Sequence, residues 1–278
     1  MKIACVQMTS ACDPADNLPV IAARVKAAVD KGARLVALPE TCTFMEKNRK
    51  AMQARLVRQE DSSELAALCA MAQEHNIYLL AGSVILADEN SDKAVNRALL
   101  IAPSGAVQAQ YDKIHMFDVA LENGERHHES AAYEAGNRLV VTNVDKVKMG
   151  LSICYDVRFP ALYRRLAEAT AQVIFVPSAF TKQTGQAHWH VLLRARAIET
   201  GCFIVAPAQI GSHENGRETY GHSLIIDPWG RILAEAADDD EMIVATLDMA
   251  LVDKARQQIP ALAHGAVFAS PDGGQDQD

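Results

Sequence analysis

One cysteine stands where the sequence would expose a nucleophile. Cys154 ends the apolar stretch 150–153, and Phe159-Pro160 soon follows it, where a helix over 159–171 is expected to begin. Proline suits the first turn of a helix, because its missing N–H would have no partner there. A sharp strand-to-helix turn exposes the side chain at the turn and directs backbone N–H groups toward its target. The alternative is a buried thiol in the core, which is common for free cysteines.

Two charged residues follow other predicted strands. Glu40 comes after the short apolar strand 34–38, and Pro39 marks the end of that strand because proline has no N–H to donate to a neighbour. Lys113 comes just after the predicted strand 105–111. Each residue taken singly has a simpler explanation, since most glutamates and lysines lie on the surface.

A thiol, a carboxylate and an ammonium group can together hydrolyse an amide through a covalent intermediate. This reaction needs a nucleophile, a base, an acid for the departing amine and donors for the oxyanion. A thiol has a pKa of about 8.5, so a base must take its proton or a cation must stabilise the thiolate. Burial would raise the pKa of Glu40 toward neutrality, which suits a base that later returns the proton to ammonia. Lys113 and the N–H of Tyr155 can stabilise the oxyanion.

The three strand ends resemble the nitrilase superfamily of carbon–nitrogen hydrolases, and in particular its Nit branch, from Lys2 to about Pro260. The motifs that carry this resemblance are Leu38-Pro39-Glu40, Asp112-Lys113-Ile114-His115, Ile153-Cys154-Tyr155-Asp156-Val157-Arg158-Phe159-Pro160, Pro177-Ser178-Ala179-Phe180, Ala187-His188-Trp189, Leu193-Arg194-Ala195-Arg196-Ala197-Ile198-Glu199, Tyr220-Gly221-His222-Ser223 and Asp227-Pro228-Trp229-Gly230. The resemblance implies that Glu40, Lys113 and Cys154 are the catalytic residues.

The resemblance also implies a second catalytic glutamate near the lysine, and the matching position is Glu129. A buried ammonium group is costly unless it is paired, so a carboxylate should hold Lys113 in place. Glu125 is close in sequence and remains the alternative partner, although the Ser130 that follows Glu129 fits the family pattern better.

Three further residues are expected to contact the substrate, namely Tyr155, Arg158 and Thr184. Arg158 lies four residues past the thiol, where its guanidinium group can hold a substrate carboxylate through two hydrogen bonds. Thr184 can supply a hydroxyl group to the same pocket. The alternative for Arg158 is a salt bridge with Asp156 or Glu168 that only holds the following helix.

The implied activity is hydrolysis of the terminal amide of a small acidic amide, similar to deaminated glutathione, through a cysteine thioester with release of ammonia. The alternatives within the superfamily are an omega-amidase acting on alpha-ketoglutaramate and a hydrolase of carbamoyl or nitrile bonds. A non-catalytic scaffold is disfavoured, because Glu40, Lys113 and Cys154 are all present.

Composition argues against several other classes of protein. A net charge of −8 disfavours nucleic-acid binding, which requires clustered lysine and arginine. The sequence has no charged leader and no apolar run of about 18 residues, so neither a signal peptide nor a membrane span is expected. Six cysteines scattered among apparent core segments suit a reducing compartment, and we expect a cytoplasmic protein.

No cofactor or metal is expected, because the histidines lack the spacing of a recognised zinc motif. The histidines considered are His115, His127, His128, His188, His190 and His222. Each is expected to have a structural or hydrogen-bonding role. The expected partners are a small-molecule amide and further copies of the chain, in a homodimer or larger homo-oligomer.

Strands and helices alternate along the chain. Strands are predicted at 2–8, 34–38, 77–85, 95–102, 105–111, 147–153, 172–177, 202–208, 222–227, 231–235 and 242–248, and helices near 16–31, 61–75, 159–171 and 186–200. Turns at Pro103-Ser104-Gly105 and Asp227-Pro228-Trp229-Gly230 predict two hairpins. This pattern predicts an α/β fold of mixed sheets covered by helices.

The resemblance makes this fold a four-layer α-β-β-α sandwich. One carbon–nitrogen hydrolase domain is expected over 1–260, since no linker divides the chain. A tail over 261–278 follows, and its Gly-, Asp- and Gln-rich end is expected to be disordered.

Overall fold

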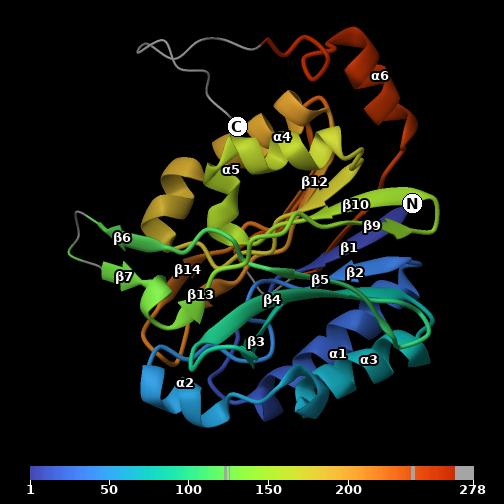
Figure 1. The fold of residues 1–278 in the computed structure, drawn as a ribbon. Coiled ribbons are helices and arrows are strands. Elements are labelled where there is room, and N and C mark those ends of the chain that lie inside the picture. The colour runs from blue at the N-terminus through green and yellow to red at the C-terminus, as the bar shows by residue number, and fades with distance from the viewer. Residues whose placement is uncertain (122–123, 125, 239–241, 267–278) are drawn as a thin grey trace.

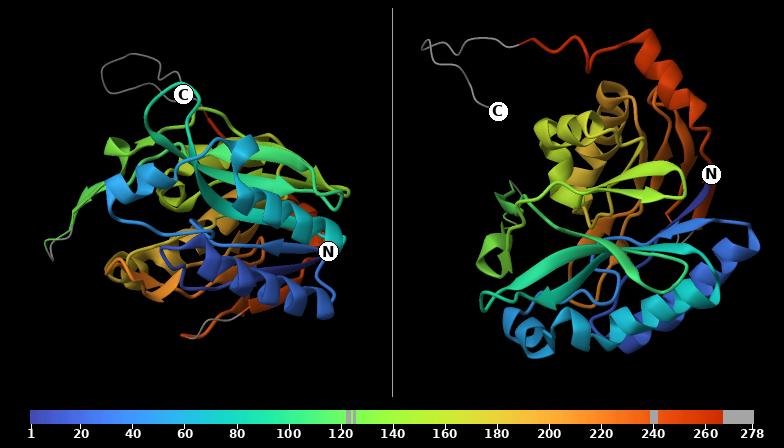
Figure 2. Two further views of the ribbon diagram at one scale, coloured as in Figure 1. Left: turned by 90° about the horizontal axis from the view of Figure 1, so that it is seen from below. Right: turned by 45° about the vertical axis from the view of Figure 1, so that its right-hand side comes forward.

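Two mixed β-sheets lie face to face, and helices cover the outer side of each sheet in the computed structural model (Figures 1 and 2). The structure describes residues 1–121, 124, 126–238 and 242–266; the alternative residue Glu125 and the end of the predicted tail lie outside them. The predicted four-layer α-β-β-α sandwich is confirmed.

The first sheet joins the N-terminal half of the chain to one strand from near the other end. Its strands, in spatial order, are β17 (Met242–Thr246), β1 (Lys2–Val6), β2 (Leu35–Ala37), β3 (Tyr78–Ala87), β4 (Ala94–Ile101) and β5 (Val107–Asp112), and β8 (Tyr133–Glu134) pairs with β4. Strands β1, β2 and β3 are parallel, whereas β4 is antiparallel to both β3 and β5. The carboxyl ends of β2 and β5 therefore lie at the same edge of the sheet.

The second sheet has the same plan, with a parallel centre and antiparallel flanks. Its strands, in spatial order, are β16 (Ile232–Glu235), β15 (Leu224–Ile226), β12 (Phe203–Ala206), β11 (Val173–Phe175), β10 (Val147–Leu151) and β9 (Val141–Val144). Two small hairpins lie outside the large sheets, formed by β6 (Asp118–Ala120) with β7 (Arg126–His128) and by β13 (Ile210–Ser212) with β14 (Glu218–Tyr220).

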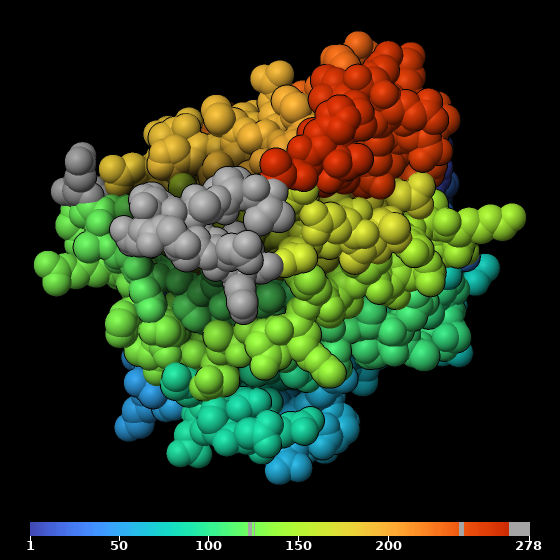
Figure 3. All heavy atoms as spheres, turned by 45° about the horizontal axis from the view of Figure 1, so that its top comes forward, coloured from blue at the N-terminus to red at the C-terminus, as the bar shows by residue number. Residues whose placement is uncertain are grey.

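Six α-helices are described, and four of them form the outer layers. They are α1 (Pro14–Asp30), α2 (Arg49–Arg55), α3 (Ser63–Glu74), α4 (Pro160–Glu168), α5 (Lys182–Thr200) and α6 (Ala250–Gln258). Helices α1 and α3 cover the first sheet, and α4 and α5 cover the second (Figure 2). Figure 3 shows α6 and the residues after it, in red, beside α4 and α5. In the part of the chain that the structure describes, no helix combines the length and apolar composition needed to cross a membrane.

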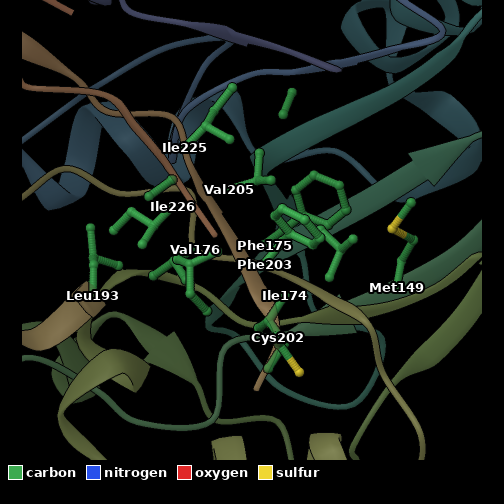
Figure 4. Close-up of a cluster of buried hydrophobic side chains, with 14 of the residues drawn as sticks. Met149, Ile174, Phe175, Val176, Leu193, Cys202, Phe203, Val205, Ile225 and Ile226 are labelled. Atoms are coloured by element: carbon green, nitrogen blue, oxygen red, sulfur yellow. The ribbon is translucent and has the colours of Figure 1, made fainter. Parts of the chain in front are cut away.

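Alternating side chains of one strand enter two different cores, as the two-residue period of a strand requires. Ile3 and Cys5 of β1 join the core shared by the two sheets, whereas Ala4 and Val6 pack with the residues of α1 and α3. Figure 4 shows part of the first of these cores, including Phe175 from β11. Strands that are buried on both faces appear in the sequence as continuous apolar runs, and this is why most of them could be predicted from the sequence.

Several predicted boundaries are wrong. The helix predicted over 186–200 begins at Lys182, because the Thr181 hydroxyl caps it and accepts from the Thr184 N–H at 3.4 Å. Gly185 lies inside the helix, and Tyr220 packs against it; a Cβ there would be 2.2 Å from that side chain. The short helix α2 and the terminal α6 were not predicted. Both predicted hairpins are confirmed.

Gly82 of β3 lies against the residues that follow β2 in the first sheet and β11 in the second sheet. A Cβ built on Gly82 would be 1.7 Å from the Leu38 carbonyl oxygen and 2.6 Å from the Pro177 Cβ. The flanking backbone bonds the same segment, since Leu38 donates its N–H to Leu80 at 2.9 Å and Ser83 donates to Pro39 at 3.2 Å. Only glycine therefore allows these three segments to meet.

We expect Gly82→Ala to lower the free energy of unfolding by at least about 3 kcal/mol, because the new methyl group must displace backbone. Denaturant unfolding measures this. Gly32→Ala is the matched control: Gly32 has a φ of +78° but no close neighbour, so alanine there costs only about 1–2 kcal/mol of left-handed strain. If both variants lost the same free energy of unfolding, the methyl group at position 82 would not collide with the backbone as proposed.

Candidate active site

Cys154 occupies a strained turn directly after β10. Its φ of +49° is left-handed, which non-glycine residues rarely adopt, and its N–H donates to the Pro177 carbonyl at 2.9 Å. A 3₁₀ turn over Cys154–Arg158 follows, and α4 begins at Pro160. The sharp strand-to-helix turn predicted from the sequence is therefore present, with a short 3₁₀ turn before the helix.

A buried carboxylate fixes this turn. Asp156 has no exposed surface and accepts the N–H of Ile153 at 2.9 Å, the N–H of His115 at 3.0 Å and the hydroxyl of Tyr111 at 2.7 Å. Tyr111 belongs to β5, and His115 lies just beyond it. One aspartate thus joins the turn in the second sheet to the end of β5 in the first sheet, which carries Lys113.

Glu40 is held by a complete set of hydrogen bonds. Its Oε1 accepts from Lys113 Nζ and from Asn96 Nδ2, both at 2.9 Å, and its Oε2 accepts from the Ala179 N–H at 2.8 Å. The Cys154 thiol lies beside this carboxylate, close enough for each group to shift the pKa of the other. A carboxylate has about four acceptor positions, so Glu40 can neither rotate nor move without losing a partner.

Lys113 lies between two carboxylates. Its Nζ is 2.9 Å from Glu40 Oε1 and 2.8 and 2.9 Å from the two oxygens of Glu129. Glu129 is fixed in turn by the Phe117 N–H at 2.6 Å. The lysine is only 2% exposed, so each of its three ammonium hydrogens is directed to a carboxylate oxygen rather than to solvent. Glu129 and Glu125 were the two candidates from the sequence for the partner of Lys113. In the structure Glu129 is paired with Lys113.

The charges of this cluster set the pKa of each member. Burial alone would raise the pKa of Glu40, but the charges of Lys113 and Arg217 and the hydrogen bonds to Glu40 outweigh it, so this pKa lies below its ordinary value. The expectation of a raised pKa for Glu40 is therefore wrong. Burial would lower the pKa of Lys113, yet Glu129 and Glu40 raise it well above its usual range.

The pKa of the Cys154 thiol is shifted in the direction opposite to that of Glu40. Burial raises the pKa of Cys154, and the negative charge of Glu40 raises it further, against a smaller lowering by Lys113. At neutral pH the resting site therefore holds a protonated thiol beside an ionised carboxylate and an ammonium group. In this arrangement the proton can pass from the sulfur to Glu40 as the sulfur forms a new bond.

A cavity of about 760 Å³ opens onto this cluster. Glu40, Lys113, Glu129 and Cys154 line it together with the predicted residues Tyr155 and Thr184.

Arg158 is not among the described lining residues. Its guanidinium group is 3.2 Å from His188 Nδ1 and lies over the rings of Tyr155 and Phe180, which do line the cavity. It pairs with neither of the carboxylates that the sequence offered as the alternative.

Sequence reasoning missed two residues that line the cavity, Asn96 and Arg217. Asn96 is 2% exposed within strand β4, which is apolar apart from Asn96 and Arg97, and a buried-strand amide was the available signal. Arg217 lies in a polar loop where nothing distinguished it from a surface arginine. Its Nη2 donates to the Ala179 carbonyl, the same residue whose N–H bonds Glu40.

These two side chains share an unusual feature. Within the described part of the chain, Asn96 Oδ1 and Arg217 Nε are the buried side-chain polar atoms that lack a hydrogen-bond partner. Buried polar atoms are nearly always paired, so this acceptor and this donor, which both belong to cavity-lining residues, are unusual.

Two of the remaining five cysteines differ from expectation. Cys5, Cys42 and Cys202 are buried as predicted, but Cys12 and Cys69 are partly exposed. Burial and the nearby charges of Glu46 and Glu214 raise the pKa of Cys12, and burial raises that of Cys69, so both thiols are protonated at neutral pH.

Comparison with known proteins gives the same assignment for nearly the whole chain. The family model described as carbon–nitrogen hydrolase matches residues 2–257. The deaminated glutathione amidase of Synechocystis sp. is 44% identical over 266 residues, which cover 94% of this chain and 96% of that protein.

Solved structures agree with the sequence match. The crystal structure of the Caenorhabditis elegans NitFhit protein has a TM-score of 0.88 and 36% identity; the match covers 95% of this chain and 64% of that one, so this chain spans less than two thirds of its length. A mutant amidase from Nesterenkonia sp. AN1, with a TM-score of 0.78 and 25% identity over 94% of this chain and 98% of that one, carries an acrylamide adduct at its active-site cysteine.

Lys113→Met should lower the free energy of unfolding by about 3–5 kcal/mol at neutral pH, because it leaves two buried carboxylates without their cation. Denaturant unfolding of both proteins measures this. Without Lys113, burial should raise the folded-state pKa of Glu40 above its unfolded value. The wild-type carboxylate, with its lowered pKa, stabilises the fold above its unfolded pKa, so the deficit of the variant should shrink as the pH falls.

Lys26→Met is the matched control for this change. Lys26 also pairs with a carboxylate, Asp30 at 2.7 Å, but the lysine side chain is 66% exposed. Its loss should change the free energy of unfolding by less than about 0.5 kcal/mol. A Lys113→Met variant that is as stable as this control would show that the buried pairs contribute nothing to the fold.

Proposed function

The chain belongs to the carbon–nitrogen hydrolase family, and from this membership we propose that it hydrolyses the terminal amide of a small acidic amide of the deaminated-glutathione type. The observation that carries the proposal is a thiol beside an ionised glutamate, both of which line a cavity whose lining also includes cationic residues. The name of the relative in Synechocystis sp., a deaminated glutathione amidase, supports the choice of substrate.

In the first half of the reaction, the Cys154 sulfur attacks the amide carbon while Glu40 takes the thiol proton. A carbon–sulfur bond forms, and the carbonyl oxygen becomes an oxyanion. Glu40 then gives its proton to the amide nitrogen, the carbon–nitrogen bond breaks, and ammonia leaves. In the second half, Glu40 removes a proton from water, and the resulting attack on the thioester releases the acid and restores the thiol.

Lys113 would act on the oxyanion through a change in its own hydrogen bonds. In the resting site its three ammonium hydrogens are directed to oxygens of Glu40 and Glu129. Once Glu40 accepts the thiol proton, it loses its negative charge and its hold on Lys113 weakens. One ammonium hydrogen then becomes available to the oxyanion, beside the N–H of Tyr155. Glu129 keeps the ammonium group in place throughout.

Recognition of an acidic substrate must be local, because the whole chain carries a net charge of −8. The cavity provides this locally, since its lining includes the cationic residues Lys47, Arg49, Arg126, Lys182 and Arg217. We assign Arg217 to the non-scissile carboxylate or keto oxygen, because its Nε is buried and has no partner among the described residues. Asn96 Oδ1 can accept an N–H of the scissile amide.

Arg158 remains a predicted contact for the substrate carboxylate. It lies over the rings of two lining residues and is 3.2 Å from His188, so it would have to leave that position to reach the cavity. Arg217 needs no such change. The volume of about 760 Å³ suits a tripeptide-sized acid better than alpha-ketoglutaramate, which is the alternative substrate.

We further propose that the enzyme is a cytoplasmic homo-oligomer. Apolar side chains on α5 and at the hairpin of β15 and β16 are exposed, including Val191 at 70%, Ile198 at 54% and Trp229 at 46%. Burying such residues against a second copy would stabilise an assembly.

Cys154→Ala should abolish ammonia release without unfolding the protein, because it removes one sulfur atom. Ammonia release from deaminated glutathione, alpha-ketoglutaramate, glutamine, carbamoyl-beta-alanine and a simple nitrile measures the activity and its breadth. Cys202→Ala, which removes a buried thiol away from the cavity, is the control and should keep its turnover. Appreciable activity of Cys154→Ala would disprove the covalent route, and equal rates on all substrates would disprove a dedicated amidase.

Arg217→Met should lower kcat/KM for acidic amides by about 10- to 200-fold, the effect of losing a charge-assisted contact of about 1.5–3 kcal/mol. Neutral amides of similar size should be affected far less. Arg158→Met tests the earlier assignment in the same assay. If only Arg158→Met selectively lowered kcat/KM for acidic amides, Arg158 rather than Arg217 would bind the substrate carboxylate. If Arg217→Met lowered kcat/KM equally for acidic and neutral amides, Arg217 would only hold the Ala179 backbone in place.

A further inference from the structure

Three side chains of metal-binding type converge outside the cavity. His190 from α5, His222 just before β15 and Glu235 at the end of β16 each offer a ligand atom, and these atoms all lie within 4.8 Å of one another. Glu235 Oε1 is 3.0 Å from His190 Nε2 and 2.8 Å from His222 Nδ1. We propose that these three residues form a structural site for a divalent transition metal of the zinc type.

The set of donor atoms selects the class of metal. Two imidazole nitrogens with one carboxylate oxygen suit zinc and its neighbours in the first transition row. Calcium and magnesium need six or more oxygen ligands or several retained waters, so they fit poorly. Three protein ligands leave a fourth tetrahedral position for water. Tetrahedral ligands at about 2.0 Å from an ion lie a little over 3 Å apart, so the two contacts of Glu235 Oε1 with the histidine nitrogens, at 2.8 and 3.0 Å, need to lengthen by only a few tenths of an ångström.

The histidine rings are oriented before any ion binds. His222 has a left-handed φ of +56°, and its carbonyl accepts from Trp189 Nε1 at 2.7 Å, so its backbone is fixed to the residue that precedes His190. Its ring stacks on Tyr220 with a centroid separation of 4.4 Å. The His190 ring meets both of these rings edge-on, at 5.6 and 6.1 Å. Such packing reduces the entropy that metal binding would otherwise cost.

Asp238 completes the arrangement. Its Oδ1 is 3.5 Å from His222 Nε2, while His222 Nδ1 faces Glu235. A metal-bound histidine usually donates its other ring N–H to a carboxylate, which fixes the tautomer and strengthens the ligand. Asp238 can take this role.

This site is separate from the catalytic cluster. None of His190, His222 and Glu235 is among the described residues that line the large cavity. An ion here would join α5 to the β15–β16 hairpin, which are separated in the sequence, and its ligands lie 32 and 13 residues apart. This spacing explains why no zinc motif is recognisable in the sequence.

Isothermal titration with zinc, on tag-free protein carrying Cys154→Ala so that the nucleophile cannot bind the ion, tests the proposal. We expect one zinc per chain. His222→Ala and Glu235→Ala should each weaken binding by more than 100-fold, and Asp238→Asn by about 10- to 100-fold. His264→Ala, which removes an exposed histidine elsewhere, should leave it unchanged.

Thermal unfolding adds a readout that does not depend on calorimetry. The Tm should rise with zinc concentration in the parent and in His264→Ala, but not in His222→Ala or Glu235→Ala. Should His222→Ala fail to fold, Glu235→Gln and Asp238→Asn make the same comparison without altering the backbone at the strained position. No zinc binding, or binding of equal affinity in the parent and the ligand variants, would overturn the proposal.

Discussion

The site depends on one buried ammonium group held between two carboxylates. Lys113 would be prohibitively costly at 2% exposure without Glu40 and Glu129, and each of these carboxylates would be costly without it. For these charged groups to pair, the ends of β2, β5 and β10 must meet at one edge of the sandwich. The close approach at Gly82, the left-handed turn at Cys154 and the buried Asp156 all serve to bring those ends together.

The same interaction fixes the protonation states that the proposed chemistry needs. Lys113 keeps Glu40 ionised despite its burial, and the charge of Glu40 keeps the neighbouring thiol protonated. In a site of this kind the sulfur gives up its proton to Glu40 as it attacks the electrophile. This differs from a thiolate stabilised by a cation, and it protects a buried nucleophile from indiscriminate alkylation and oxidation.

Much of the fold followed from the sequence, because strands buried on both faces are continuous apolar runs and their turns contain Pro, Gly and Asp. The three strand-end residues were also found, since Glu40, Lys113 and Cys154 stand at abrupt changes from apolar to reactive side chains. The start of α5 was missed although its cap, Thr181, is local. The lowered pKa of Glu40 was missed because it depends on a distant segment, which places Lys113 beside the buried carboxylate. Arg217 escaped notice for the same reason.

The central claim is that the resting enzyme holds a protonated thiol beside an ionised Glu40. Infrared difference spectroscopy between the wild type and Glu40→Gln at neutral pH tests it most directly. We expect a sulfhydryl band in both proteins, at lower frequency in the wild type because its thiol lies against a carboxylate, and an ionised carboxylate band that the variant lacks. A protonated carboxyl band that disappears in Glu40→Gln, with no sulfhydryl band from Cys154 in the wild type, would contradict it.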